Sequence, residues 1–233
     1  MSTRSKRWTW KRWLVIGMIA LGVAVVGGPF LYIHVVQGEA PAPLSLASPS
    51  SGMANTTSTN GTSGTWKVAR GSVVGYRVKE VLFGQSNVAV GRTSRLSGSM
   101  VVDGSTISKA TVTVDMASVT SNESRRDEQF NGRIMETATY PTATFALTRA
   151  IDFGSVPKAG AQRTLRITGT LTLHGVTRTV TFTATGRYTG SAVQVAGSIP
   201  IRFADYGISN PSFGPVTTAD HGVLEFSLTL TRP

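Results

Sequence analysis

The feature that most constrains this chain is an alternation of apolar and polar residues that begins near Thr65 and continues almost to the C-terminus. Between residues 164 and 173, for example, Leu165, Ile167, Leu171 and Leu173 alternate with threonines and one arginine. A period of two places the apolar side chains on one face of an extended strand and the polar ones on the other. Residues 65–233 are therefore predicted to form antiparallel β-sheet with one buried face.

The same pattern predicts about eight strands. It covers 74–78, 96–102, 110–116, 145–147, 165–173, 180–188, 193–203 and 224–230, with a tight turn at 174–176. Asp103-Gly104 and Thr189-Gly190 supply the turn chemistry of hairpins. Eight antiparallel strands can close into a lipocalin-like barrel, which removes exposed edges and leaves an interior for side chains or one small ligand. A two-sheet sandwich is the alternative, because alternation alone does not distinguish the two.

The inward face of these strands supplies the candidate ligand-binding residues. Its glycines, Gly98, Gly169, Gly186 and Gly197, either widen the lumen or mark bends, and the sequence leaves both readings open. The candidate ligand-binding side chains are Tyr76, Met100, Phe145, Leu147, Leu171, Leu173, Phe182, Ile199, Ile201, Phe203 and Phe226.

Between Val119 and Glu136 the alternation gives way to a charged stretch in which Phe130 and Ile134 have near-helical spacing. One helix packed on the barrel is predicted here, capped by Ser121 or Asn122. Pro141 is expected to end this region before the strand at 142–147.

The N-terminal region has a different composition. Residues 1–12 are basic, and 13–37 contain no charged side chain over a length sufficient to cross a bilayer core of about 30 Å. We therefore expect a transmembrane anchor with a cytoplasmic N-terminus and an extracytoplasmic C-terminal domain. A signal peptide cleaved near Gly38-Glu39-Ala40 is the alternative. Residues 38–64, rich in Pro, Ser, Thr and Gly, are predicted to be a disordered linker.

Catalytic motifs are lacking in the sequence. It has no cysteine, and His34, His174 and His221 have no metal-binding spacing, so no catalytic residue, metal site or cofactor is expected. His174 is interpreted as a turn residue bonded to nearby backbone. Arg126 and Asp127 are interpreted as a salt bridge that ties the helix to the barrel. The net charge of +11 is partly explained by the basic N-terminus, and the remaining surplus is dispersed, which does not indicate nucleic-acid binding.

Several segments, in the same order along the sequence, resemble the YceI-like family of extracytoplasmic bacterial proteins. They include Trp66-Lys67, 72–79, 118–127, 140–145, 169–178 and 201–208, so the resemblance covers nearly all of 65–233. It implies a barrel whose elongated apolar lumen binds a polyisoprenoid, an isoprenoid quinone or a similar amphiphile. This chain departs from the usual pattern at Glu128-Gln129-Phe130 and at 88–91.

The sequence thus predicts a non-enzymatic, membrane-attached protein that holds an isoprenoid or other long-chain lipid. Its expected partners are that lipid, the membrane through the N-terminal helix and, as an open alternative, a second copy in a homodimer. A surface-displayed structural domain with a filled core is the rival hypothesis. An enzyme acting on prenyl lipids is a third, with Arg126, Asp127, His174 and Asp205 as its only candidates.

Overall fold

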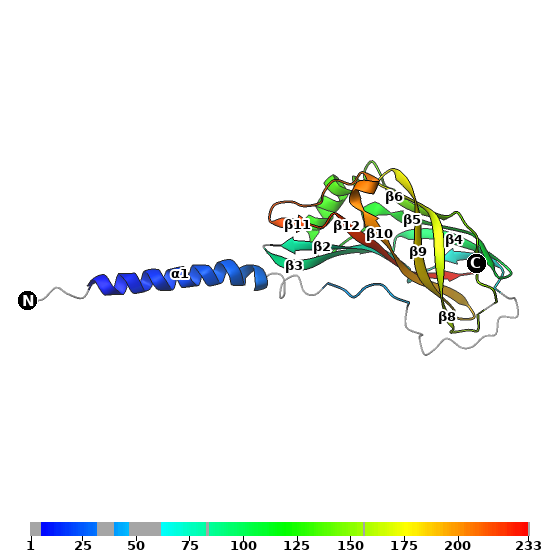
Figure 1. Cartoon of the computed structure of the whole chain (residues 1–233), viewed down its shortest axis with the longest axis horizontal. Helices are drawn as coiled ribbons and strands as arrows, with labels where there is room; N and C mark the ends of the chain where they lie inside the picture. The colour runs from blue at the N-terminus through cyan, green and yellow to red at the C-terminus, as the bar shows by residue number, and fades with distance from the viewer. Residues whose placement is uncertain (1–5, 32–39, 47–61, 83, 156, 233) are drawn as a thin grey trace, which may run out of the picture.

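The computed structural model describes residues 6–31, 40–46, 62–82, 84–155 and 157–232 (Figure 1). The first element is a helix, α1 (Lys6–Leu31), and the folded body begins at residue 62. Residues 32–37 of the predicted anchor lie outside the described residues. Within the part of the chain that is described, no helix combines the length and hydropathy of a membrane span.

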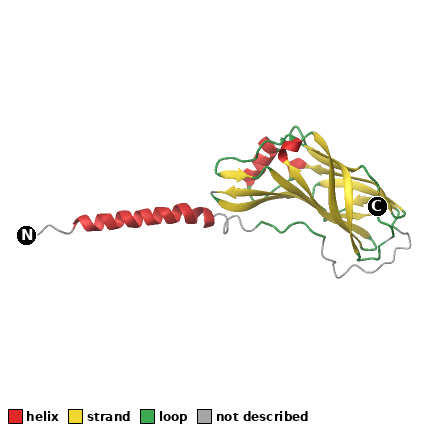
Figure 2. Ribbon diagram, viewed as in Figure 1, coloured by secondary structure: helices red, strands yellow, loops and turns green. Residues whose placement is uncertain are grey.

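The body consists mainly of β-strands (Figure 2). The described strands are β1 (Gly64–Val68), β2 (Val73–Leu82), β3 (Gln85–Thr93), β4 (Leu96–Asp103), β5 (Thr106–Asp115), β6 (Thr142–Leu147), β7 (Ile151–Asp152), β8 (Gln162–Leu173), β9 (Val176–Tyr188), β10 (Ala192–Arg202), β11 (Val216–Thr218) and β12 (His221–Thr231).

These strands form a closed antiparallel barrel. Eight of them follow in the order β1-β4-β5-β6-β8-β9-β10-β12, and β1 pairs with β12 to complete the ring. β2 pairs with the N-terminal part of β12, which extends past the residues that pair with β1. β3 and β11 in turn pair with β2. The predicted eight-stranded barrel is therefore confirmed and the two-sheet sandwich was the wrong alternative.

Each of the eight predicted runs coincides with a strand, with small differences at the ends. Met116 and Phe203 belong instead to short 3₁₀ helices, η2 (Met116–Ser118) and η4 (Phe203–Tyr206). The sequence pattern missed β1, β3, β7 and β11. At β3 the residues that interrupt the family pattern, 88–91, pair regularly with β2.

The predicted helix is shorter than expected. It comprises α2 (Ser124–Gln129), followed by a π-helical turn, η3 (Phe130–Ile134). Its N-cap is Glu123 rather than Ser121 or Asn122, because Ser121 instead donates through its N–H and hydroxyl to Asp127 at 2.8 and 2.7 Å. The chain stays extended before this point because Thr120 exchanges two backbone hydrogen bonds with Arg92 of β3.

The barrel interior contains two apolar clusters. One cluster lies under α2 and includes Phe130, Leu171, Phe182 and Ile201. The other surrounds Trp66 and includes Met100, Val102 and Leu230. We refer below to the α2 end and the Trp66 end of the barrel. Each cluster brings together side chains that lie far from each other in the sequence.

Candidate functional site

A single large cavity of about 1090 Å³ extends through the barrel between these two ends. All eleven side chains predicted to face the ligand line this cavity, including Tyr76 and Phe203 near the α2 end and Met100 near Trp66. The predicted inward face is therefore correct. Whether these residues contact a ligand stays a prediction.

Three phenylalanines from distant strands form one wall of the cavity. The ring centroids of Phe145 and Phe182 are 5.6 Å apart, and those of Phe182 and Phe226 are 5.8 Å apart, in both cases edge to face. This geometry is favourable for aromatic pairs. The three rings hold β6, β9 and β12 together and present apolar edges to the lumen.

The four inward glycines do not share one role. A Cβ on Gly169 would lie 2.5 Å from the ring of Phe145, and one on Gly197 would lie 2.9 Å from the ring of Phe226. At Gly98 it would lie 2.2 Å from the carbonyl oxygen of Thr111. These three glycines therefore accommodate close packing and do not widen the lumen. Gly186 differs, because it lines the cavity and its nearest neighbours would be 3.8 Å from a Cβ.

At the Trp66 end the cavity is lined by the indole of Trp66, which is 1% exposed. Its Nε1–H donates to the carbonyl of Thr62 at 3.0 Å, and Tyr188 packs edge-on against it at 6.1 Å. The guanidinium of Arg232 lies 4.7 Å from the ring centroid.

Thr62 and Ser63 belong to the predicted linker, yet both are bonded to Gly104 of the β4–β5 turn. Trp66 was not among the predicted site residues, although it belongs to the family-like segment.

At the α2 end the lining becomes partly polar. Arg126 forms an ion pair with the buried Glu80 at 3.0 Å, and Asn87 donates to the same carboxylate at 2.7 Å. Tyr76 stacks on Phe130 with ring centroids 5.2 Å apart. Burial raises the pKa of the Tyr76 phenol above its ordinary value, while Arg126 lowers it and the Asp127 and Glu80 carboxylates raise it. The phenol is thus kept neutral beside an ion pair.

The interpretation of Arg126 and Asp127 as a pair is corrected by these contacts. Arg126 ties α2 to β2 through Glu80, whereas Asp127 accepts hydrogen bonds from Ser121. The two residues hold the helix through separate partners because adjacent side chains on a helix point in different directions.

The four candidates for a prenyl-lipid enzyme are not brought together. Of these, only Arg126 lines the cavity. His174 sits in the turn with a left-handed φ of 50°, and its Nδ1 lies 3.2 Å from the carbonyl oxygen of Tyr206, as predicted. Within the described ranges, no group of His, Asp and Glu side chains is arranged to hold a metal ion.

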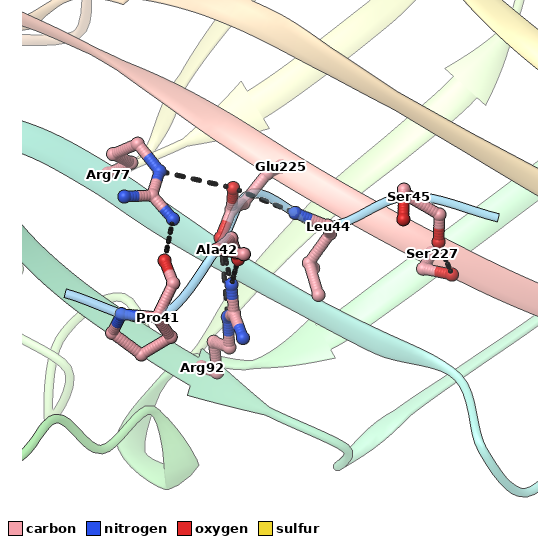
Figure 3. Close-up of polar contacts among 8 residues, drawn as sticks. All are labelled: Pro41, Ala42, Leu44, Ser45, Arg77, Arg92, Glu225 and Ser227. Carbon is pink, nitrogen blue, oxygen red and sulfur yellow. Dashed lines mark hydrogen bonds and ion pairs between the residues drawn. The ribbon is translucent and has the colours of Figure 1, made fainter. Parts of the chain in front are cut away.

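A second polar assembly lies on the outside of the barrel (Figure 3). Glu225 of β12 has a side chain only 2% exposed and pairs with Arg92 at 2.9 Å and with Arg77 at 3.4 Å. Gly75 allows this arrangement, since a Cβ there would lie 2.8 Å from the Arg92 side chain. The acid is buried because another segment covers it.

That segment is residues 40–46, from the predicted linker, which we call the strap. The N–H of Leu44 donates to Glu225 at 3.2 Å, and the Ser227 hydroxyl donates to the carbonyl of Ser45 at 2.8 Å. Arg77 and Arg92 donate to the carbonyls of Pro41 and Ala42. Figure 3 shows both arginines directed at the strap from neighbouring strands. The strap therefore lies along the outer face of β2, β3 and β12.

Residues 66–230 match the model of the YceI-like domain. The chain belongs to this family. Among curated relatives, a UPF0312 protein of Vibrio parahaemolyticus is 33% identical over 51% of this chain and 64% of its own length. A UPF0312 protein of Pseudomonas putida is 32% identical over 45% of this chain and 54% of its own length. The chain thus spans about half to two thirds of these relatives.

Solved structures show the same fold. A polyisoprenoid-binding domain from Saccharophagus degradans, implicated in plant cell wall breakdown, superposes with a TM-score of 0.57 at 20% identity, over 73% of this chain and 99% of that domain. Burkholderia cenocepacia BcnA superposes with a TM-score of 0.51 at 25% identity, over 66% of this chain and 95% of that protein.

Proposed function

We propose that this protein is an extracytoplasmic binding protein that holds an isoprenoid or another long-chain apolar lipid inside the barrel. The observation that carries the proposal is the cavity of about 1090 Å³ with its almost wholly apolar lining. This volume slightly exceeds the roughly 300–1,000 Å³ typical of small-molecule pockets. An elongated, apolar ligand suits it best.

The energetics support such a ligand. Burial of ~400 Å² of prenyl surface contributes on the order of 10 kcal/mol at about 25 cal/mol per Å². Association and ordering remove part of this gain. Micromolar or tighter affinity follows without any charged contact, so the ligand class is set by apolar length and shape rather than by a headgroup.

Two further observations favour binding over the rival hypotheses. The structural neighbour from Saccharophagus degradans is described as a polyisoprenoid-binding domain. A domain with a filled core would contain no cavity of this size, because protein interiors are packed to nearly crystalline density. An enzyme built on the four predicted candidates would need them together along the lumen, but Asp127, His174 and Asp205 lie outside the cavity lining.

The proposal is tested by thermal unfolding of the full chain in mild detergent with prenyl ligands of increasing length. A ligand that binds only the folded state raises the unfolding temperature with concentration. We expect long prenols and isoprenoid quinones to stabilise the protein, and short polar alcohols to have no effect. Absence of stabilisation by every prenyl compound would refute the binding function.

The proposed location is the outer side of a cell membrane, with the uncharged run at 13–37 as the anchor and residues 1–12 in the cytoplasm. The chain has no cysteine, so Thr181→Cys on the exposed face of β9 creates a unique labelling site. A membrane-impermeant thiol reagent is expected to label this variant in intact spheroplasts. Labelling only after lysis would reverse the topology, and release of the domain into the medium would favour the cleaved signal peptide. Homodimer formation also stays a prediction.

A further inference from the structure

The α2 end of the barrel differs from the rest of its surface in exposed apolar side chains. Outside α1, the large hydrophobic residues with substantial exposure among the described residues are Phe213, at 63%, and Val81, at 41%. They lie close in the fold, since Val81 of β2 pairs with Thr217 of β11 and Phe213 bridges to Val216. An exposed apolar pair at one end of a barrel indicates a contact surface.

The loop that carries Phe213 is held in place by Arg133 of η3. Its guanidinium donates to the carbonyls of Asn210 and Pro211 at 3.2 and 3.0 Å, and lies 5.7 Å from the centroid of the Phe213 ring. The exposed ring is therefore presented by defined contacts. Arg125 of α2 and Lys79 of β2 are exposed at this end together with the acidic Glu128. With Arg133, the basic side chains outnumber this acid, and the positive surplus suits a surface of anionic headgroups.

The same end gives access to the cavity. Phe213 and Pro215 of the β11 loop, together with Arg125 and Glu128 of α2, are exposed and also line the cavity. At the opposite end the buried Trp66 indole lines the lumen, and Arg163 is exposed there and also borders the cavity. A ligand that enters at the α2 end therefore passes between the exposed apolar tip and the helix.

The strap fixes this end relative to the N-terminal helix. Ala40 and Pro41 lie in a surface recess beside Asn87, Val90 and Arg126, at the α2 end. α1 ends at Leu31, so Ala40 lies within about 30 Å of the helix terminus by chain length alone. The Trp66 end lies roughly 25–30 Å further along the barrel, because β10, with eleven residues, runs nearly from one end to the other along a strand tilted to the barrel axis.

We propose that the α2 end docks on the lipid bilayer that holds the N-terminal helix, with Phe213 and Val81 inserted among the headgroups. The cavity then loads directly from the membrane, and the lipid crosses no water. This inference rests on the proposed lipid-binding function and the proposed N-terminal membrane anchor, and adds the route of entry. The strap acts as the tether that keeps the open end turned toward the bilayer.

The test uses the full chain reconstituted in vesicles of phosphatidylcholine with a fifth of phosphatidylglycerol. The chain lacks cysteine, so Phe213→Cys and, as control, Ser191→Cys in the exposed β9–β10 turn at the Trp66 end each take one environment-sensitive fluorophore. We expect a blue shift and quenching by nitroxide lipids at position 213, and neither at 191. Equal, water-like spectra at the two positions would overturn the proposal.

A second measurement separates docking from binding. The variant Val81→Asp, at an exposed position outside the cavity lining, should transfer a fluorescent polyprenol from donor vesicles about tenfold more slowly than the unmodified chain, yet retain the same amount of polyprenol in detergent. Unchanged transfer would contradict membrane docking. Failure of both proteins to retain polyprenol in detergent would instead refute the binding function, while the fluorophore at 213 still reports whether the end docks.

Discussion

The two ends of the barrel are built in different ways although the same strands run through both. The Trp66 end is filled by one indole packed against Tyr188 and Arg232 and bonded to Thr62. The α2 end is covered by a six-residue helix, which is held by the ion pair of Arg126 with Glu80 and by hydrogen bonds from Ser121 to Asp127. Apolar packing fills the first end, whereas a few polar contacts hold the second. The first end is therefore suited to stability and the second to opening.

A substitution in the barrel wall near the α2 end should give the largest effect. Leu171→Arg replaces a side chain that is 4% exposed and lines the cavity. Loss of its packing together with an unpaired interior charge should cost more than about 5 kcal/mol of unfolding free energy. Thr172→Arg, on the outer face of the same strand, should cost less than about 0.5 kcal/mol. Urea unfolding of both variants checks the contrast, and equal tolerance would mean that the faces are misassigned.

The next largest effects on the free energy of unfolding are expected from substitutions at the two ends themselves. Trp66→Ala removes the indole and should cost about 3–5 kcal/mol. Arg126→Ala leaves Glu80 with its hydrogen bond from Asn87 and should cost only about 1–3 kcal/mol, while accelerating ligand release. Chemical unfolding and release kinetics of a fluorescent polyprenol measure the two effects. A larger loss of stability for Arg126→Ala than for Trp66→Ala would reverse the roles assigned to the ends.

The glycines provide a smaller and more specific contrast. In Gly169→Val the new Cβ would lie 2.4 Å from the carbonyl oxygen of Ala146, so strain of about 1–3 kcal/mol is expected. Gly186→Val meets no atom closer than 3.8 Å and should leave stability unchanged or slightly higher while reducing ligand capacity. Thermal unfolding and polyprenol binding of the two variants test this. Similar behaviour of both would show that Gly186 does not border free space.

The smallest effect concerns the Tyr76 phenol at the α2 end. Burial raises the pKa of this group in the folded state above its ordinary value of 10.0. The unfolded chain therefore releases the proton first, and the stabilisation is present below about pH 10 and is lost as the pH rises above it. Tyr76→Phe should lose less stability between ~pH 9 and ~pH 11 than the unmodified chain. Parallel urea unfolding curves at both pH values check this, and an identical alkaline loss in the two proteins would show that Tyr76 does not contribute.

The sequence was sufficient to predict the barrel and its inward face, because every candidate from Tyr76 to Phe226 follows a period of two that burial imposes on each strand separately. It did not predict the role of three glycines, since the rings that occupy their space, such as Phe145 over Gly169, come from neighbouring strands. The period of two is a local signal, whereas this packing depends on the register between strands.

The contacts of the strap and the start of the helix could not be predicted, for the same reason. A Pro- and Ser-rich stretch has no periodicity, and residues 40–46 are held by Arg77, Arg92 and Glu225 from distant parts of the chain. Outward charges on strands normally indicate solvated positions, so nothing local marked Glu225 as buried. Likewise the bridge between Thr120 and Arg92, which shortens the helix, depends on β3, a strand that the sequence pattern did not reveal.

The most direct test of lipid storage in the barrel is native mass spectrometry of the full chain purified in mild detergent, with extraction and identification of any bound lipid. A matched variant, Gly186→Leu, fills part of the cavity without meeting a close neighbour and serves as the comparison. The unmodified chain is expected to carry a prenyl lipid or another long-chain apolar lipid in a one-to-one complex, and Gly186→Leu, folded by circular dichroism, should carry markedly less. An unmodified chain that is folded but has only its own mass, with no lipid in the extract, would contradict the account.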